Sequence, residues 1–252
     1  MAVSINNVYQ KVLAIANKEQ RGYITPQEFN LFADQAQKEI FEQYFYDLEQ
    51  RQRAVGNEFD YADIVTNIEE KISIFEVADS AVSTIDNFGN INVSTSVPVN
   101  RPLHMLGHVK IQYTNLYGGK MCTVEQMQMK ELEKYGNSPL GIWTKRRPIY
   151  VKYSAPDDPV RIQIYPHPQG DAIIWINYIR KPKKPNWTYI ISSGSGGALF
   201  NPDPVAGWQD FELHGSEETA LVIKILQLAG IAIKDFGLAQ ATGQKEVNTI
   251  QQ

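Results

Sequence analysis

The chain has 252 residues, 43% of them hydrophobic and 21% charged, with a formal net charge of −4 at pH 7. This acidic balance argues against a protein dedicated to neutralising DNA, which needs clustered lysine and arginine. The single cysteine, Cys122, excludes an internal disulfide and a multi-cysteine zinc site. The longest apolar run, residues 219–233, is shorter than the roughly 18–20 residues of a membrane span, and the first residues lack a secretory signal pattern. We therefore expect a protein made in a cytoplasm, with a sizeable core and no membrane span.

Two helices are predicted at the N-terminus. Ser4 can cap the first, which should end near Asn17. The second starts in residues 25–28, Thr-Pro-Gln-Glu, which combine an N-cap threonine, a proline at the first helical position and the glutamate of a capping box. Apolar residues then recur at three- and four-residue steps, so this helix should continue almost to Gly56. About 28 residues at ~1.5 Å each give a rod of roughly 42 Å, which suits a wall against neighbouring subunits.

The connection between these helices resembles a calcium-binding loop at several positions. Oxygen ligands, a glycine and a final glutamate are required there at fixed spacing. The matching positions are Asn17, Glu19, Arg21, Gly22, Ile24 and Glu28. Arg21 occupies a ligand position, where a cation repels calcium, and the capping box explains Glu28 without a metal. We expect no calcium.

The middle of the chain is predicted to be rich in strands. Residues 72–97 are rich in β-branched side chains, and residues 108–114 alternate as a strand does. A short capped helix is expected from Thr123 to Gly136. Three further period-two runs follow at residues 148–154, 161–165 and 172–179, separated by strong turn signals, and predict an antiparallel meander. The third run is apolar on both faces, which favours a central strand that is covered on each side.

The last hydrophobic segment, Ala220–Ile233, is apolar nearly all the way round, so we expect a helix enclosed on every face, partly by other chains. Ser216 with two following glutamates suits its first turn, and Gly237 can end it. The polar residues 238–252 would reach roughly 50 Å if extended at ~3.3 Å per residue, far enough to contact a neighbouring ring.

Together these patterns predict an α+β fold in which helices from the N-terminal and C-terminal regions pack together, with a β-rich middle that contains the meander. The chain is expected to start with a helical segment (1–56) and a β-rich insertion (57–122). A stretch with the short helix, meander and loop follows (123–212). A C-terminal helix (213–237) then completes the helical core, and a polar arm (238–252) ends the sequence.

No catalytic, cofactor or metal site is expected. The four histidines form no HExxH pattern, Cys122 lies in no recognised nucleophile motif, and no GxSxG is present. Two basic stretches, residues 145–147 and 180–184, have tryptophans nearby. They are interpreted as solvated loops or as contact rims against acidic neighbours, with a nucleic-acid surface as the alternative.

Three stretches together resemble a known family. They are residues 22–52 (GYITPQEFNLFADQAQKEIFEQYFYDLEQRQ), residues 165–189 (YPHPQGDAIIWINYIRKPKKPNWTY) and residues 211–246, beginning FELHGSEETALVIKILQLAGIAI. The combination resembles head-tail connector or ring (adaptor) proteins of short-tailed bacteriophages, in particular those of crAss-like gut phages. The resemblance implies a structural virion protein of the neck or tail, made in the host cytoplasm and forming a ring, commonly of twelve subunits. Such a ring joins the portal to the tail and gives DNA a passage during ejection, without sequence-specific binding.

On this interpretation the partners are further copies of the chain, the portal and neighbouring tail or ring proteins. The residues expected at subunit or ring contacts are Phe41, Tyr44, Leu226, Ile233, Leu238, Val247 and Ile250. The alternative is a β-rich ligand- or glycan-binding virion protein that uses its exposed tryptophans. These are Trp143, Trp175, Trp187 and Trp208.

Overall fold

The structure is a computed structural model that describes residues 2–18, 24–53, 59–82, 90–93, 102–113, 119–138, 141–155, 158–168, 172–191 and 198–232. The chain forms two compact units. The helical unit combines Met1–Ile74 with Pro182–Gln252, and the sheet unit comprises Phe75–Lys181. The sequence-based prediction of an α+β fold with helices from both ends and strands in the middle is confirmed.

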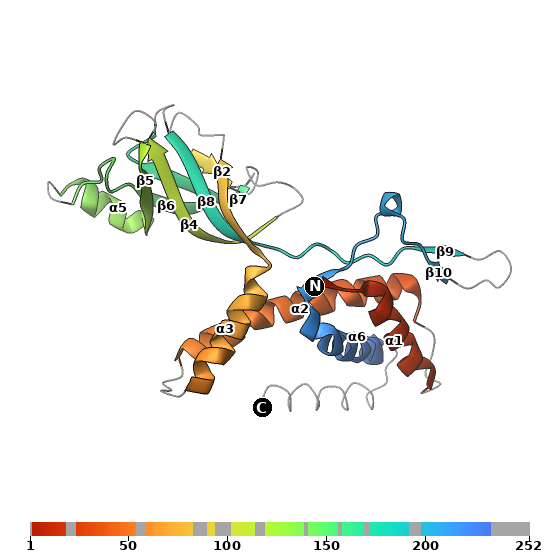
Figure 1. Cartoon of the computed structure of the whole chain (residues 1–252). Helices are drawn as coiled ribbons and strands as arrows, with labels where there is room; N and C mark the ends of the chain where they lie inside the picture. The colour runs from red at the N-terminus through yellow and green to blue at the C-terminus, as the bar shows by residue number, and fades with distance from the viewer. Residues whose placement is uncertain are drawn as a thin grey trace. The chain divides into compact units, whose positions relative to one another are not determined.

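Among the residues that the structure describes, the helical unit contains four helices (Figure 1). They are α1 (Ile5–Lys18), α2 (Pro26–Arg53), α3 (Phe59–Ser73) and α6 (Glu218–Ala232). Helix α6 packs against α1 and α2, and α3 packs against α2. Among the described helices, none combines the length and apolarity that crossing a membrane requires.

The capping box at the start of α2 forms as the sequence predicted. The Thr25 backbone N–H and hydroxyl donate to Glu28 Oε2 at 2.9 and 2.8 Å, and the Glu28 N–H donates back to Thr25 Oγ1 at 3.3 Å. These bonds, first that of the Thr25 backbone, lower the pKa of Glu28. The helix has the expected length of 28 residues. Residues 19–23 of the connection that resembles a calcium loop lie outside the described residues.

The starts of α1 and α6 are held by long-range and local partners. The short strand β1 (Ala2–Val3) pairs with β11 (Phe211–His214), and the Ile5 N–H donates to Asp210 Oδ1 at 2.8 Å. Asp210 therefore supplies a side-chain oxygen at the start of α1, where Ser4 is the last residue before the helix and its carbonyl accepts from the Val8 N–H at 3.2 Å. A 3-10 turn, η3 (Gly215–Glu217), precedes α6. The N-cap of this turn is His214, and Ser216, which was expected at the start of the helix, lies within the turn.

One subunit encloses helix α6 only in part. Five of its apolar side chains are buried within the subunit, namely Leu221, Val222, Ile225, Leu226 and Ala229. Ile223 and Leu228 are only half-buried. The subunit therefore covers most, but not all, of this apolar helix.

A curled mixed sheet of seven strands forms the sheet unit, in the order β2-β8-β4-β5-β6-β7-β3. Its strands are β2 (Glu76–Val82), β3 (Asn90–Asn92), β4 (Leu103–Tyr113), β5 (Met121–Met127), β6 (Ile149–Ala155), β7 (Asp158–Tyr165) and β8 (Ala172–Arg180). Neighbouring strands are antiparallel except β5 and β6, which are parallel. A short helix, α5 (Met129–Gly136), follows β5.

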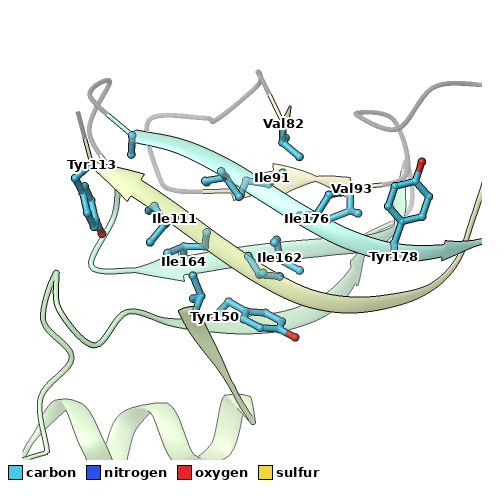
Figure 2. Packing of buried hydrophobic residues seen from close by; sticks show 14 residues of the cluster. Val82, Ile91, Val93, Ile111, Tyr113, Tyr150, Ile162, Ile164, Ile176 and Tyr178 are labelled. Carbon is cyan, nitrogen blue, oxygen red and sulfur yellow. The ribbon is translucent and has the colours of Figure 1, made fainter. Parts of the chain in front are cut away.

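Alternating side chains from these strands form one core inside the curl (Figure 2). Ile111 of β4 and Ile176 of β8 point toward Ile162 and Ile164 of β7, and all four are fully buried. In β4, β7 and β8 every second residue therefore lies on the buried side, as the alternation of a strand requires.

Several details of the predicted middle are wrong. Residues 59–73, expected at the start of a β-rich insertion, form helix α3, and residues 123–126, expected to start a helix, belong to β5. The three-stranded meander does not form, because β8 pairs with β2 and β4 instead of β7. Strand β8 is central, but only one face is fully buried; Ile173 on the other face is 40% exposed.

Candidate assembly site

A small hairpin of the helical unit exposes the densest group of large apolar side chains among the described residues. Strands β9 (Tyr189–Ile191) and β10 (Ala198–Phe200) pair antiparallel and extend away from α1 and α6 (Figure 1). Ile190, Ile191 and Leu199 are 57, 66 and 60% exposed. Residues 185–202, which include both strands, carry no charged side chain. Exposed apolar groups of this kind mark contact sites for other molecules.

The base of this hairpin is an aromatic cluster. Trp187 is 2% exposed and stacks on Tyr189 and Phe200, with ring centroids 5.8 and 6.0 Å apart. The ring centroids of Trp187 and Tyr9 of α1 are 4.0 Å apart, and the Trp187 indole N–H donates to Asn6 Oδ1 at 3.2 Å. The first residues of the hairpin are therefore fixed to α1.

Side-chain amides of α2 hold the chain that leads into the hairpin. The Trp187 N–H donates to Asn30 Oδ1 at 2.8 Å, and Asn30 Nδ2 donates to the Trp187 carbonyl at 3.1 Å. Asn30 thus bonds both backbone groups of Trp187, as a neighbouring strand would.

Gln37 repeats this arrangement two turns later on the same face of α2. It is fully buried; its Nε2 donates to the Lys183 carbonyl at 2.7 Å, and its Oε1 accepts from the Glu212 N–H at 3.1 Å. The Glu212 carboxylate in turn accepts from the Lys183 N–H at 2.8 Å. Gln37 therefore links two extended segments that are distant in sequence to one helix.

A further contact ties these extended segments together. Asn186 and Gln209 exchange backbone hydrogen bonds of 2.9 and 3.1 Å. The hairpin thus has a rigid base, whereas its two short strands have no third strand among the described residues. An isolated two-stranded hairpin is at best marginally stable in water, so a partner on its apolar face would stabilise it.

Three of the seven residues that the sequence predicted at subunit contacts are described, and they are buried. Phe41, Tyr44 and Leu226 are 2, 5 and 5% exposed, so they pack inside the helical unit and their assignment as contact residues is wrong. Their apolar pattern marks the intramolecular face of each helix. Ile233, Leu238, Val247 and Ile250 lie outside the described residues.

Tyr44 instead belongs to a charged junction of three elements. Lys71 of α3 pairs with Glu217 beside α6, and the Lys71 Nζ lies 5.6 Å from the Tyr44 ring centre. Burial, and secondarily the nearby Glu217 carboxylate, raise the pKa of the Tyr44 hydroxyl. This junction connects α2, α3 and the start of α6.

The tryptophans do not offer the exposed platform that a glycan-binding surface needs. Trp187 is in the core, and the indole nitrogens of Trp175 and Trp208 are also buried. The ring centroids of Trp143 and Tyr165 are 5.3 Å apart. These surroundings are those of packed side chains.

The chemistry-bearing residues remain scattered over the described part of the chain. No group of three or more His, Cys, Asp or Glu side chains there is arranged to hold a metal ion. Cys122 is half-buried in β5 as a free thiol. The sequence analysis expected a loop toward the end of residues 123–212 and missed this hairpin. The available signal was the uncharged stretch 185–202, which has aliphatic pairs on both sides of a Gly-Ser run.

No protein-family model matches the chain, and no curated protein matches it either.

Proposed function

We propose that this chain is a structural, non-enzymatic virion protein that forms a ring in the phage neck or tail. The ring joins the portal to the tail and leaves a passage for the genome during ejection. The observation that supports this proposal best is the β9–β10 hairpin, which is apolar, uncharged and exposed at its strands but fixed at its base. It adds to the resemblance of the terminal segments to connector proteins.

The fixed base suits a protein that assembles repeatedly in one geometry. Ordering a contact segment costs free energy at each association, and a pre-organised segment avoids that cost. Asn30 and Trp187 fix the backbone beside the hairpin before any partner arrives. Specificity then comes from shape and apolar contact, because the hairpin offers no charge to a partner.

Replacement of the exposed aliphatic residues tests the role of the hairpin. Burying Ile or Leu at a contact contributes about 1.5–3 kcal/mol. The double variant Ile190→Ser/Leu199→Ser should therefore weaken association at least ~100-fold. Assembly is measured by sedimentation and by incorporation into particles, and the melting temperature should stay unchanged because both side chains are already exposed.

Val205→Ser is the matched control, since Val205 is 92% exposed in the same unit but lies outside the hairpin. It should assemble as the unchanged chain does. Equal assembly of the double variant would remove the hairpin from the proposal. The ring itself is tested by a cryo-microscopy map of intact particles, and absence of the chain from the neck and tail would refute it.

A further inference from the structure

Each strand of the hairpin has one edge without a neighbouring strand. Among the strands that the structure describes, β9 and β10 pair with each other and with no third strand. The Asn201 N–H donates to the Thr188 carbonyl at 2.9 Å, so these backbone groups lie on the inner side of the hairpin. Backbone groups alternate in direction along a strand, so those of the paired residues Ile190 and Leu199 also point inward. Those of the residues between them point outward.

The outer edge of β9 begins at a position that α2 already occupies. Asn30 bonds both the N–H and the carbonyl of Trp187. Tyr189 and Ile191 follow at steps of two residues, so their backbone groups face the same edge as those of Trp187. No described strand continues the pairing that Asn30 starts there. The edge of β9 is therefore available to a further strand at these two residues.

The outer edge of β10 has the same length. Ala198 and Phe200 direct their backbone groups to this edge, and Pro202, which has no N–H, follows at the next position of the alternation. Each edge thus offers two residues with one donor and one acceptor each. If β10 meets a second β9 antiparallel, Ala198 faces Ile191 and Phe200 faces Tyr189. This register is also the one inside the hairpin.

Neither strand carries the features that protect an exposed edge from further pairing. Such edges usually have a lysine or another charge, a proline within the strand, or a bulge. The two strands read Tyr-Ile-Ile and Ala-Leu-Phe, and their register has no shift. The whole stretch 185–202 is uncharged, so two copies meet there without like-charge repulsion. These edges are therefore suited to pair with an identical hairpin.

We propose that β10 of one copy pairs antiparallel with β9 of the next copy, so that the hairpins form one continuous closed sheet. The inference rests on the proposed ring and names the partner of the hairpin as a second copy of this chain. Two different edges meet in this contact, and a contact of this kind closes into a ring when its rotation allows. Closure gives every strand two neighbours and leaves no open edge, as in a barrel.

Pairing between unlike edges accounts for both strands, whereas the alternatives account for one. If β9 paired with β9 of another copy about a two-fold axis, both β10 edges would stay open. Pairing of β10 with β10 would leave both β9 edges open in the same way. A strand from a different protein would also cover one edge and leave the other. Copies of this chain, by contrast, supply the two edges in equal number.

The same register also aligns the exposed side chains. Ile190 and Leu199 are cross-strand neighbours in the hairpin and are 57 and 60% exposed. They lie on the face opposite to Tyr189 and Phe200, which stack on Trp187. Between copies, Leu199 stands beside Ile190 of the next copy. The pairing thus joins the exposed aliphatic pairs into one unbroken apolar row.

Two single-cysteine chains test the pairing directly. Cys122→Ser removes the native thiol from both chains, and Ile190→Cys is placed in one and Leu199→Cys in the other, which excludes a disulfide within one hairpin. Co-expressed and mildly oxidised, they should form a disulfide dimer that contains one chain of each kind. The two positions face each other between copies without direct hydrogen bonds, at the Cα separation of about 4.5 Å that a disulfide accepts. Each chain expressed alone should form no such dimer.

Val205→Cys is the control for random collision, because Val205 is 92% exposed in the same unit but lies outside the hairpin. Co-expressed with the Ile190→Cys chain, it should give at least tenfold less disulfide dimer. Tags of different mass on the two chains identify which chains each dimer contains.

A proline at the outer edge tests whether the backbone takes part. Ala198→Pro removes an outward N–H at the first residue of β10, a position where strands tolerate proline. It should weaken association at least tenfold in sedimentation, whereas the matched variant Ala198→Thr keeps the N–H and should associate as the unchanged chain does. Melting curves check the fold of both variants, and if the proline variant melts early, the disulfide experiment decides alone.

Several outcomes would overturn the pairing. If the mixed chains give no more dimer than the Val205→Cys control, β9 and β10 do not meet between copies. Dimers of the Ile190→Cys chain alone, or of the Leu199→Cys chain alone, would show a two-fold contact instead. Normal association of a folded Ala198→Pro chain would exclude backbone pairing. None of these results removes the ring, which the particle map judges separately, and absence from the neck and tail would refute the ring even if the mixed dimer forms.

Discussion

Replacing Gln37 should destabilise the helical unit strongly, although Gln37 is an ordinary polar residue on a helix. Its amide satisfies the Lys183 carbonyl and the Glu212 N–H, and the side chain is fully buried. Gln37→Met keeps the length and the apolar volume but makes neither bond. Leaving a buried backbone group unsatisfied costs about 1–3 kcal/mol, so two such groups predict a loss of about 2–6 kcal/mol in the free energy of unfolding.

The measurement is urea unfolding followed by far-UV circular dichroism. With a slope of about 2 kcal/mol per molar urea, the midpoint should fall by about 1–3 M. Gln35→Met is the control, because Gln35 is exposed and bonds only its neighbour Glu39 at 2.9 Å; it should change stability by less than ~0.5 kcal/mol. Equal midpoints for the two variants would refute the idea that Gln37 holds the returning chain on α2.

Three further changes probe the charged groups of the helical unit. Glu28→Gln should destabilise α2 above pH 4.5, which is the ordinary pKa of the carboxyl. Because the fold lowers the pKa of Glu28, the difference in stability between the variant and the unchanged chain should disappear as the pH falls. A difference that persists in acid denaturation would contradict this. The fold raises the pKa of the Tyr44 hydroxyl above the ordinary value of 10.0. The stability contributed by the neutral hydroxyl is therefore present below pH 10.0 and is lost as the pH rises above it. Tyr44→Phe should accordingly reduce the loss of stability at alkaline pH in thermal melts. Lys71→Met should leave the Glu217 carboxylate, which is only 13% exposed, without its partner, and should lower the free energy of unfolding by about 1–3 kcal/mol in urea titrations. Lys38→Met changes a pair whose lysine is 60% exposed and should lower it by less than ~0.5 kcal/mol.

Local patterns predicted the elements that local physics determines. The capping box fixed the start of α2 at Pro26, since all its hydrogen bonds lie within four residues. The alternation of residues 172–179 predicted β8 as a strand, but both of its faces are apolar, so the sequence did not show which face is buried. By contrast, the sequence analysis missed α3. The β-branched residues that follow it suggested strands, whereas the four-residue spacing of Ile64, Ile68 and Ile72 is that of a helix.

Long-range pairing lay beyond sequence patterns. Nothing within β8 distinguishes pairing with β7 from its observed place between β2 and β4, because each strand offers the same backbone groups. The candidate site was only partly predictable for the same reason. The hydrogen bonds of Asn30 and Gln37 reach segments that are more than 140 residues away in the chain. The apolar periodicity that suggested Phe41, Tyr44 and Leu226 as contact residues identifies buried positions, but it does not say which chain buries them.

The insertion of the sheet unit into the helical unit also sets the timing of biosynthesis. Leu221 and Ile225 of α6 cover the faces of α1 and α2, but about 150 residues must be translated after Ile74 before α6 exists. At roughly 5–20 residues per second, the apolar faces of α1 and α2 wait about 10–30 s at the ribosome. The sheet unit is complete during that interval and can fold first. A nascent chain thus cannot present a finished helical unit to another copy until nearly all of the described chain has been made.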